Sequence, residues 1–233
     1  MLNKKKIVVL SGAGISAESG IPTFRDSNGL WEGHDVMEVA TPMGWKKNPE
    51  LVLDFYNKRR MSARKASPNA GHYALANLEK NFEVVVVTQN VDDLHERAGS
   101  SKVIHLHGEL SKSRSCVDEN LIYNVPDGII NLGDLCEKGS QLRPHIVWFG
   151  EMVPMMERAA EEASTADIFM VVGTSLLVYP AAGLIDYVRE NVPVFIIDPK
   201  MPNIATNPNL ILIEEKASTG LEKAVSMILK RSK

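Results

Sequence analysis

Six short runs of apolar, mostly β-branched residues recur along the chain and restrict its fold more than any other feature. The runs are Ile7–Leu10, Val84–Thr88, Val103–Leu106, Ile168–Val172, Val194–Asp198 and Leu210–Ile213. Several are apolar at successive positions, which is typical of strands that are buried on both faces of a parallel sheet. Segments with a helical pattern lie among them, at 50–65, 70–79, 155–163, 180–190 and 220–229. This alternation predicts an α/β fold in which helices cover an open sheet.

Two stretches interrupt the alternation. Residues 20–80 contain a long loop and helices with no strand between them, and residues 109–142 show no clear period. We expect these stretches to form a small module inserted into the sheet domain. The predicted core comprises about 1–30, 80–108 and 143–233, and the predicted insertions are about 31–79 and 109–142.

Composition argues against some classes of binding partner. The formal net charge is -3, which gives no general electrostatic reason to bind nucleic acid. No stretch approaches the roughly 18 consecutive apolar residues that a membrane span needs. The two cysteines, Cys116 and Cys136, cannot form a disulfide framework, which agrees with a reducing compartment. We therefore expect a cytoplasmic protein that binds neither nucleic acid nor membrane, with a monomer as the working expectation.

A glycine-rich turn follows the first predicted strand. Its sequence, Gly12-Ala13-Gly14-Ile15-Ser16-Ala17, is the dinucleotide-binding pattern with alanine at the third small position, and we expect it to open a helix. Glycines let the backbone turn sharply and approach a pyrophosphate. The ordinary pattern places a second strand, ending in Asp or Glu, about 20 residues later. That strand is absent, and Glu18–Asp26 follows instead.

Five segments in this order resemble the sirtuins. They are Gly12–Asp26, Thr88–Asp92, Leu106–Gly108, Arg143–Glu151, and Gly173–Ser175 with Val178. The resemblance implies a single catalytic domain over 1–233, with a Rossmann-like doubly wound sheet and a small module. It also implies a reaction in which NAD is consumed as co-substrate. An acyl group leaves a lysine of a protein or peptide, and the products are nicotinamide and O-acyl-ADP-ribose.

The resemblance implies two catalytic residues, His107 and Asn90. An imidazole with a pKa near neutrality can take a proton from a ribose hydroxyl, and His107 stands directly before Gly108, as the family's base does. We expect His105, two residues earlier, to point the opposite way and to be structural. Asn90 and Asp92 are expected to hold the carboxamide and ribose region of NAD, although an Asx turn at a strand end would also explain them.

The remaining cofactor contacts are implied in the same way. Phe24 is expected over the nicotinamide ribose and Arg25 on the cofactor side, while Ser16 either contacts the phosphates or caps a helix. Asp198 stands where the family commonly has Asn facing the adenine ribose. The full predicted set is Gly12, Ala13, Gly14, Ser16, Phe24, Arg25, Gln89, Asn90, Asp92, Gly173, Thr174, Ser175, Asp198 and Ala217.

The cysteines depart from the family pattern. Sirtuins usually carry two C-x-x-C-like pairs that bind zinc tetrahedrally, but Cys116 and Cys136 each lack a partner at that spacing. Two thiolates are half of a closed structural ligand set, and His145 belongs to the substrate segment. We therefore expect no zinc and no other bound metal, and a module held by packing.

A second departure concerns the substrate. Tyr56 and Arg59 share one face of a predicted helix, and a guanidinium pairs bidentately with a carboxylate. A sirtuin subclass with this Tyr-x-x-Arg pair prefers succinyl or malonyl groups to acetyl. The resemblance also implies that Val147, Phe149, Gly150 and Val178 line the edges between which the substrate backbone adds as a strand.

Three alternatives remain open from the sequence. The chain could be a plain NAD-dependent deacetylase, or a mono-ADP-ribosyltransferase in which a protein side chain traps the ribosyl cation. It could also be a non-catalytic module that binds NAD or ADP-ribose. The presence of His107 argues against the last of these, because a sensor does not need a base.

Overall fold

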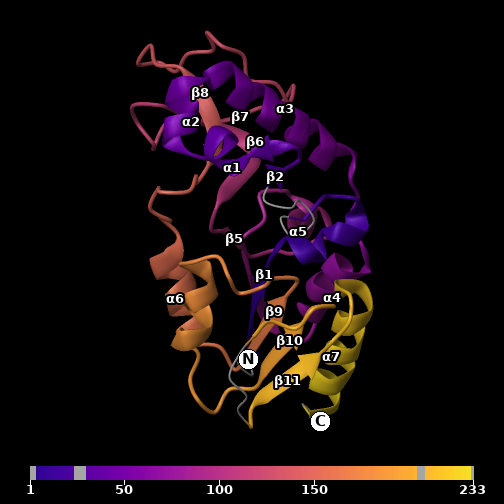
Figure 1. Cartoon of the computed structure of the whole chain (residues 1–233). Coiled ribbons are helices and arrows are strands. Elements are labelled where there is room, and N and C mark those ends of the chain that lie inside the picture. The colour runs from indigo at the N-terminus through magenta and orange to yellow at the C-terminus, as the bar shows by residue number, and fades with distance from the viewer. Residues whose placement is uncertain (1–3, 24–29, 204–207, 232–233) are drawn as a thin grey trace.

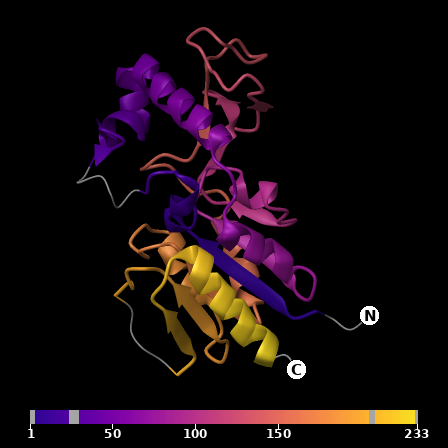
Figure 2. The same cartoon turned by 90° about the vertical axis from the view of Figure 1, so that its right-hand side faces the viewer.

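The computed structural model describes residues 4–23, 30–203 and 208–231. Two regions are visible in Figure 1: a large parallel sheet flanked by helices at the bottom, and a smaller α+β region at the top. We call them the sheet domain and the small module. The chain passes between them several times, as the change of colour along the ribbon in Figure 2 shows.

The sheet domain is built on a six-stranded parallel sheet with the order β11-β10-β9-β1-β4-β5. Its strands are β1 (Lys6–Ser11), β4 (Glu83–Thr88), β5 (Val103–His105), β9 (Ile168–Val172), β10 (Val194–Ile197) and β11 (Leu210–Ile213). All six predicted strands are confirmed, with ends that differ by one residue at most. Counted along the sheet, this is the doubly wound order, in which the direction of winding reverses between β1 and β9.

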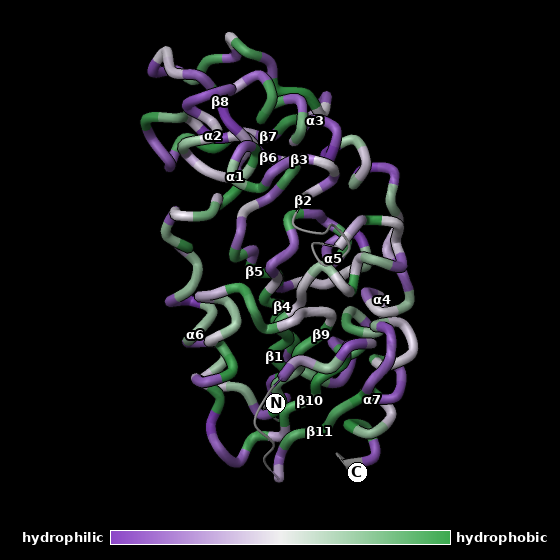
Figure 3. Tube along the Cα trace, viewed as in Figure 1, coloured by the Kyte–Doolittle hydropathy of each residue, from purple (hydrophilic) through white to green (hydrophobic). Residues whose placement is uncertain are grey.

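Both faces of the sheet are buried, as the apolar runs predict. Along β1, Ile7 and Val9 pack in one apolar core, while Val8 and Leu10 pack in the other. Helices α4 (Ala70–Leu78) and α7 (Ala217–Arg231) cover the first face. Helix α6 (Met156–Ser164) and the 3-10 helix η4 (Ala181–Tyr187) cover the second. Figure 3 shows the resulting band of hydrophobic colour along the strands.

Two segments predicted as α-helices are 3-10 helices instead. The glycine turn leads into two single turns, η1 (Ala13–Ile15) and η2 (Ala17–Ser19), because Gly20 takes a left-handed φ of 83° and stops the helix. The segment 180–190 contains η4, in which the Gly183 N–H donates to Pro180 O, three residues back.

The small module contains strands that the sequence pattern did not predict. Its three-stranded antiparallel sheet has the order β7-β6-β8, formed by β6 (Gly108–Ser115), β7 (Ile122–Asn124) and β8 (Leu142–Ile146). A hairpin of two-residue strands, β2 (Leu30–Trp31) and β3 (His34–Asp35), precedes it in the chain. These strands are short or largely polar, and so they carry no apolar alternation.

Three successive helices follow the hairpin, and each begins at a polar cap. They are α1 (Val36–Val39), α2 (Pro42–Lys47) and α3 (Pro49–Lys65). The side chains of Asp35, Thr41 and Asn48 accept hydrogen bonds from the first-turn N–H groups of α1, α2 and α3 respectively. Proline stands at the first position of α2 and α3, where its missing N–H removes no helix bond.

The two inserted stretches share one apolar core. Val52 and Phe55 of α3 pack with Leu110 of β6 and Trp148, which follows β8.

Two elements near the expected boundaries between the sheet domain and the small module lie on the other side from the one that the sequence suggested. Helix α4 packs on the sheet beside α7, and β8 pairs with β6 in the module. A short helix, α5 (Leu94–Arg97), follows β4.

Candidate active site

The carboxyl ends of β1 and β9 define the place where a ligand is expected in this fold. These neighbouring strands lie where the winding of the sheet reverses, and a crevice opens there in doubly wound proteins. The Gly12–Ser16 turn follows β1, and the Gly173–Ser175 turn follows β9. The topology therefore brings together two of the segments that sequence predicted for the cofactor.

These two turns interlock through their glycines. The Gly12 N–H donates to Val172 O at 2.9 Å, and the Gly14 N–H donates to Gly173 O at 2.8 Å. A Cβ on Gly14 would lie 2.6 Å from the Cα of Gly173, and Gly173 itself has a φ of 63°. Glycine is thus required at these positions by the contact between the loops, in addition to any approach of a ligand.

Most N–H groups of the first turn are already used inside the protein. Those of Gly12, Gly14, Ile15 and Ser16 all donate to backbone carbonyls. Within the described parts of the chain, the Ala13 N–H is the one in this turn without such a bond. The turn therefore offers a phosphate fewer backbone donors than the sequence pattern suggests.

Ser16 joins the turn to the loop after β4. Its side chain is fully buried; its hydroxyl donates to Asp92 Oδ2 at 3.2 Å and accepts from Asn90 Nδ2 at 3.1 Å. It makes no side-chain cap to either 3-10 turn. Ser16 is therefore a positioning residue for Asn90 and Asp92, which is a role that neither sequence interpretation of it contained.

Asp92 is a buried acid at this cluster. Burial raises its pKa, and hydrogen bonds from the Leu94 N–H and the Ser16 hydroxyl oppose part of that shift. Asn90 is held from the other side, since its N–H donates to Thr88 Oγ1 at 3.0 Å. Asn90 and Asp92 are both 6% exposed, so they form a buried polar cluster whose side chains are already held in place.

The ring of His107 is oriented as a base. Its Nδ1 lies 3.0 Å from Gln89 O, and because a carbonyl can only accept, Nδ1 carries a proton. Nε2 is then the unprotonated nitrogen of the neutral ring. Burial lowers the pKa of His107, and the bond to Gln89 O opposes that shift in part. Gln89 in turn donates from Nε2 to Thr174 Oγ1 at 3.1 Å.

The expectation for the direction of His105 is wrong. Residues two apart on an extended chain share a face, and His105 also turns towards the loop after β4, with Nδ1 3.1 Å from Asn90 O. Its Nε2 lies 2.7 Å from Glu96 Oε1, so both nitrogens face acceptors. Burial would lower the pKa of His105, but the bond and charge of Glu96 raise it overall. Both ring nitrogens of His105 are thus occupied by bonds within the protein, which separates His105 from His107.

Tyr56 and Arg59 both lie buried on α3. Tyr56 has no exposed surface, and its hydroxyl accepts from Trp148 Nε1 at 3.1 Å, so its own proton can still be donated. Burial raises the pKa of Tyr56. Burial lowers the pKa of Arg59, while Glu32, Tyr56 and Asp92 oppose that shift.

The predicted substrate-edge residues, Val147, Phe149, Gly150 and Val178, lie outside the strands. Val147 donates its N–H to His107 O at 2.9 Å, and Phe149 donates to Ala40 O at 3.0 Å. Gly150 has a φ of 90°, which turns the chain after Phe149. Val178 is half-buried next to the exposed Leu177 and Tyr179. The Val147 bond ties one edge directly to the residue predicted as the base.

The other predicted cofactor residues are spread along the same sheet edge. Asp198 follows β10, is 1% exposed, and accepts from the Lys200 N–H at 2.8 Å. Ser175 follows Thr174 in the turn after β9. Ala217 begins α7 and is buried against Gly71 of α4. Phe24 and Arg25 lie outside the described residues.

The cysteine loops contain half of a tetrahedral ligand set. Cys136 Sγ donates to Ser115 Oγ at 3.3 Å, and Lys138 pairs with Asp118 at 2.7 Å across the same two loops. Among the described residues, no group of three or more His, Cys, Asp or Glu side chains is placed to hold a metal. The residues of these loops therefore do not fit a structural zinc.

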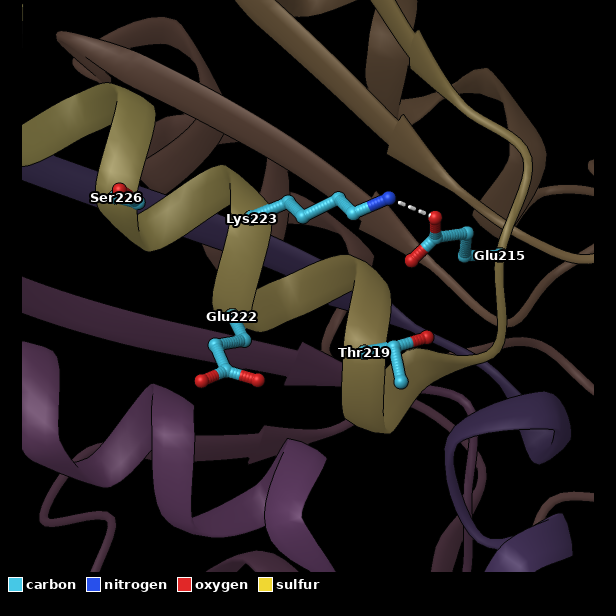
Figure 4. Close-up of a pocket in the computed structure, with 5 residues that line it drawn as sticks. All are labelled: Glu215, Thr219, Glu222, Lys223 and Ser226. Carbon is cyan, nitrogen blue, oxygen red and sulfur yellow. Dashed lines mark hydrogen bonds and ion pairs between the residues drawn. The ribbon is translucent and has the colours of Figure 1, made fainter.

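The surface hollow in Figure 4 is a different place from this site. It has a volume of ≈ 600 Å³ on the outer side of α7, and Lys223 forms an ion pair with Glu215 at its rim. Its lining residues are Glu215, Thr219, Glu222, Lys223 and Ser226. None of them belongs to the predicted site, and the hollow lacks the buried polar groups found at the sheet edge.

Four residues near the site escaped the sequence prediction. Glu32 binds Arg59, and Trp31 packs against the same guanidinium. Trp148 binds Tyr56, and Glu151 binds Arg143 at 2.7 Å. Trp148 and Glu151 lie inside a segment that was recognised but whose individual roles were not assigned. Glu32 and Gly33 stand between Trp31 and His34, so no apolar alternation or standard hairpin dipeptide marks the turn that holds the first two.

The chain is similar to known proteins over most of its length. The Sir2 family model matches residues 12–180. An NAD-dependent protein deacylase of Helicobacter pylori is 53% identical over 225 residues, covering 97% of this chain and 98% of that protein. A protein of the same name from Bacteroides thetaiotaomicron is 50% identical over 230 residues, with 97% and 98% covered.

Solved structures agree with the sequence relatives. A Sir2 homologue bound to NAD superimposes with a TM-score of 0.86 at 41% identity, covering 98% of this chain and 91% of that one. A Sir2 complex with a p53 peptide and NAD+ gives a TM-score of 0.80 at 31% identity, with 96% and 93% covered. The predicted α/β fold, with its parallel sheet and small module, is therefore confirmed. By the extent of these matches, the chain belongs to the Sir2 family.

Proposed function

We propose that the protein is an NAD-dependent protein-lysine deacylase that prefers succinyl and malonyl groups and retains some deacetylase activity. Its products would be nicotinamide and O-acyl-ADP-ribose. The observation that carries the reaction is the His107 ring, whose protonated Nδ1 faces Gln89 O and leaves Nε2 as a base. The observation that carries the preference is the buried guanidinium of Arg59.

The cofactor edge supports NAD as co-substrate by the chemistry of its donors and acceptors. Ala13 N–H and the hydroxyls of Thr174 and Ser175 can donate to phosphate oxygens. The Asp198 carboxylate at the end of β10 can accept from ribose hydroxyls. Bound NAD would supply the ribosyl carbon that receives the acyl oxygen and the nicotinamide that leaves.

Different residues of the chain would then orient the cofactor and transfer the proton. Asn90 and Asp92, fixed by Ser16, orient the nicotinamide and ribose end. His107 Nε2 takes a proton from a ribose hydroxyl, and the lowered pKa keeps the ring neutral and ready to accept at physiological pH. Holding the partners in line can supply several kcal/mol of the barrier, at roughly 7–11 kcal/mol in favourable cases.

The preference for acidic acyl groups follows from charge. Arg59 is 8% exposed, and a buried guanidinium is stabilised by a carboxylate partner. Tyr56 can add a neutral donor from the same face of α3. An acetyl group offers neither charge nor a second acceptor, so it gains nothing from this pair.

One experiment tests the proposal directly. The protein is incubated with NAD and acetyl, malonyl and succinyl versions of one peptide, and products are read by mass spectrometry. We expect nicotinamide and O-acyl-ADP-ribose, with kcat/KM greatest for the two acidic groups. Equal or greater kcat/KM for acetyl would favour a plain deacetylase. Transfer of ADP-ribose to protein, or NAD binding without turnover, would favour the other two alternatives.

We further propose that the protein works as a monomer in the cytoplasm. Among the described residues, no helix is both long enough and apolar enough to cross a membrane. Both cysteines are free thiols, which suits a reducing compartment. Gel filtration with light scattering and fractionation of cells would test the two parts separately.

A further inference from the structure

The guanidinium of Arg59 already has a carboxylate partner within the protein. Arg59 Nη1 lies 2.5 Å from Glu32 Oε1, and the guanidinium carbon lies 4.1 Å from the centre of the Trp31 ring. Arg59 Nε is buried and has no hydrogen-bond partner among the described residues. The cation that we assign to the substrate is therefore only partly satisfied, and the partner it has comes from a turn.

Glu32 occupies a position that its own backbone disfavours. It forms the two-residue turn between β2 and β3 together with Gly33, and the two φ angles are 50° and 85°. Such turns favour Asn or Asp before Gly, because an ordinary side chain is strained at positive φ. Asn or Asp would suit the turn better, but glutamate has the longer reach. The residue type thus fits the contact with Arg59 better than it fits the turn.

The charges around Arg59 argue against two carboxylates at once. Glu32 is already bound to it at 2.5 Å. A substrate carboxylate beside Glu32 would be a second negative group on one buried positive charge, and like charges at such separations repel. The Glu32 side chain is 30% exposed, so it can leave for solvent when a competing carboxylate enters.

We propose that Glu32 is a specificity-determining residue. In the absence of an acidic substrate it pairs with Arg59 at the position that the substrate's carboxylate would take. An acidic acyl group displaces it, whereas a neutral acyl group leaves the Glu32–Arg59 pair intact. Glu32 thereby satisfies a buried cation in the absence of an acidic substrate and reduces the affinity for that substrate by competition. This inference rests on the proposed preference for acidic acyl groups.

The test compares KM values for succinyl and acetyl versions of one peptide. Glu32→Asn removes the carboxylate and suits the turn, so the hairpin is retained. We expect the ratio of the succinyl KM to the acetyl KM to fall about tenfold, the effect of one charge-assisted contact. Glu32→Gln should lower it in the same direction. Glu38→Gln, at an exposed glutamate of α1, is the matched control and should leave the ratio at its wild-type value.

A double variant shows whether the effect passes through Arg59. In an Arg59→Met background, Glu32→Asn should leave the ratio unchanged, because no cation remains to compete for. An unchanged or increased ratio in Glu32→Asn alone would mean that Glu32 merely holds Arg59 in place, and would overturn the inference while the acidic preference stands. If the wild type removed acetyl but not succinyl groups, the acidic preference would be overturned and the inference with it.

Discussion

The two faces of the main sheet are packed with apolar side chains, whereas the small module buries positive charge. The four arginines that are buried among the described residues all belong to the module: Arg59, Arg60, Arg114 and Arg143. Arg60 donates to Leu110 O and to Gly128 O, and so joins α3 to two loops. Arg143 binds Glu151 and stacks on Trp148, 3.3 Å from the ring centre.

This contrast separates two ways of stabilising a region. Apolar burial is non-directional and scales with the area removed from water, so the sheet depends on a repeated pattern. A guanidinium has five donors in a fixed plane, so the module depends on individual residues in set places. The proposed cofactor site lies on the first kind of structure, and the proposed acyl-binding residues lie on the second.

The largest expected effect is at the proposed cofactor site, where we assign the base to His107. His107→Ala removes the base but leaves the Ser16, Asn90 and Asp92 cluster intact, so NAD should still bind. Deacylation should fall by about 10²–10⁴-fold. Nicotinamide exchange should fall less, because it does not need the ribose proton to be removed. Near wild-type deacylation in a steady-state assay would contradict the assignment.

The pH profile of the wild type sharpens the same point. The pKa of His107 is lowered, so the neutral base persists to lower pH than for an ordinary histidine near 6.5. kcat/KM should therefore fall only below that value as the ring gains a proton. His105, whose pKa is raised, would give loss beginning above it. An acidic limb centred above 6.5 would point to His105.

Two substitutions test the difference in stabilisation. Leu75→Ala, on the buried face of α4, should lower the free energy of unfolding by about 2–5 kcal/mol. Glu151→Gln removes the partner of Arg143 and Arg114 and should lower it by about 1.5–3 kcal/mol at neutral pH. Urea unfolding measures both.

The free energy of unfolding at low pH should distinguish Glu151→Gln from Leu75→Ala. Burial alone would raise the pKa of Glu151, but Arg143, the Trp148 N–H and Arg114 lower it overall. Its contribution is therefore present above the ordinary pKa near 4.3 and is lost as pH falls through the lower folded value. The Glu151→Gln deficit should vanish there, while the Leu75→Ala deficit remains. A pH-independent Glu151→Gln deficit would mean that packing, not charge, stabilises this part.

The proposed acyl-binding residues, Tyr56 and Arg59, should show a smaller and selective effect. Arg59→Met keeps an apolar stem but removes the charge, so kcat/KM for a succinyl peptide should fall roughly ten- to hundredfold, equivalent to about 1.5–3 kcal/mol. Deacetylation should hold steady or improve. Tyr56→Phe should give a smaller shift in the same direction, since one neutral donor is lost. Equal losses with both peptides would make Arg59 structural.

The smallest expected effect is that of a chelator. The Cys116 and Cys136 loops lack a full ligand set, and the Lys138–Asp118 pair joins them instead. The unfolding midpoint should not change on chelation, as measured by thermal melting with metal analysis alongside. One zinc per chain, with unfolding when it is removed, would show that ligands come from elsewhere in the chain.

The sequence predicts the sheet domain better than it predicts the loops of the site and the small module. The β-branched runs predicted every strand of the main sheet, because burial on both faces leaves a continuous apolar signal. Ser16, Asn90 and Asp92 were each selected, but their mutual bonds depend on loop geometry that no pattern contains. Glu32 could not be assigned, since its contact with Arg59 spans 27 positions and begins in a two-residue turn.

The interlocked glycines limit how this enzyme could be redesigned. A side chain on Gly14 would strike Gly173, and a side chain on Gly173 would lie 2.4 Å from the Ile15 nitrogen. Each substitution adds atoms to the same space, so no second change at the other glycine can compensate for the first. A library that varies the two loops independently would consist mostly of misfolded members. Protein engineers should therefore exchange the Gly12–Ser16 and Gly173–Ser175 loops together, as one cassette.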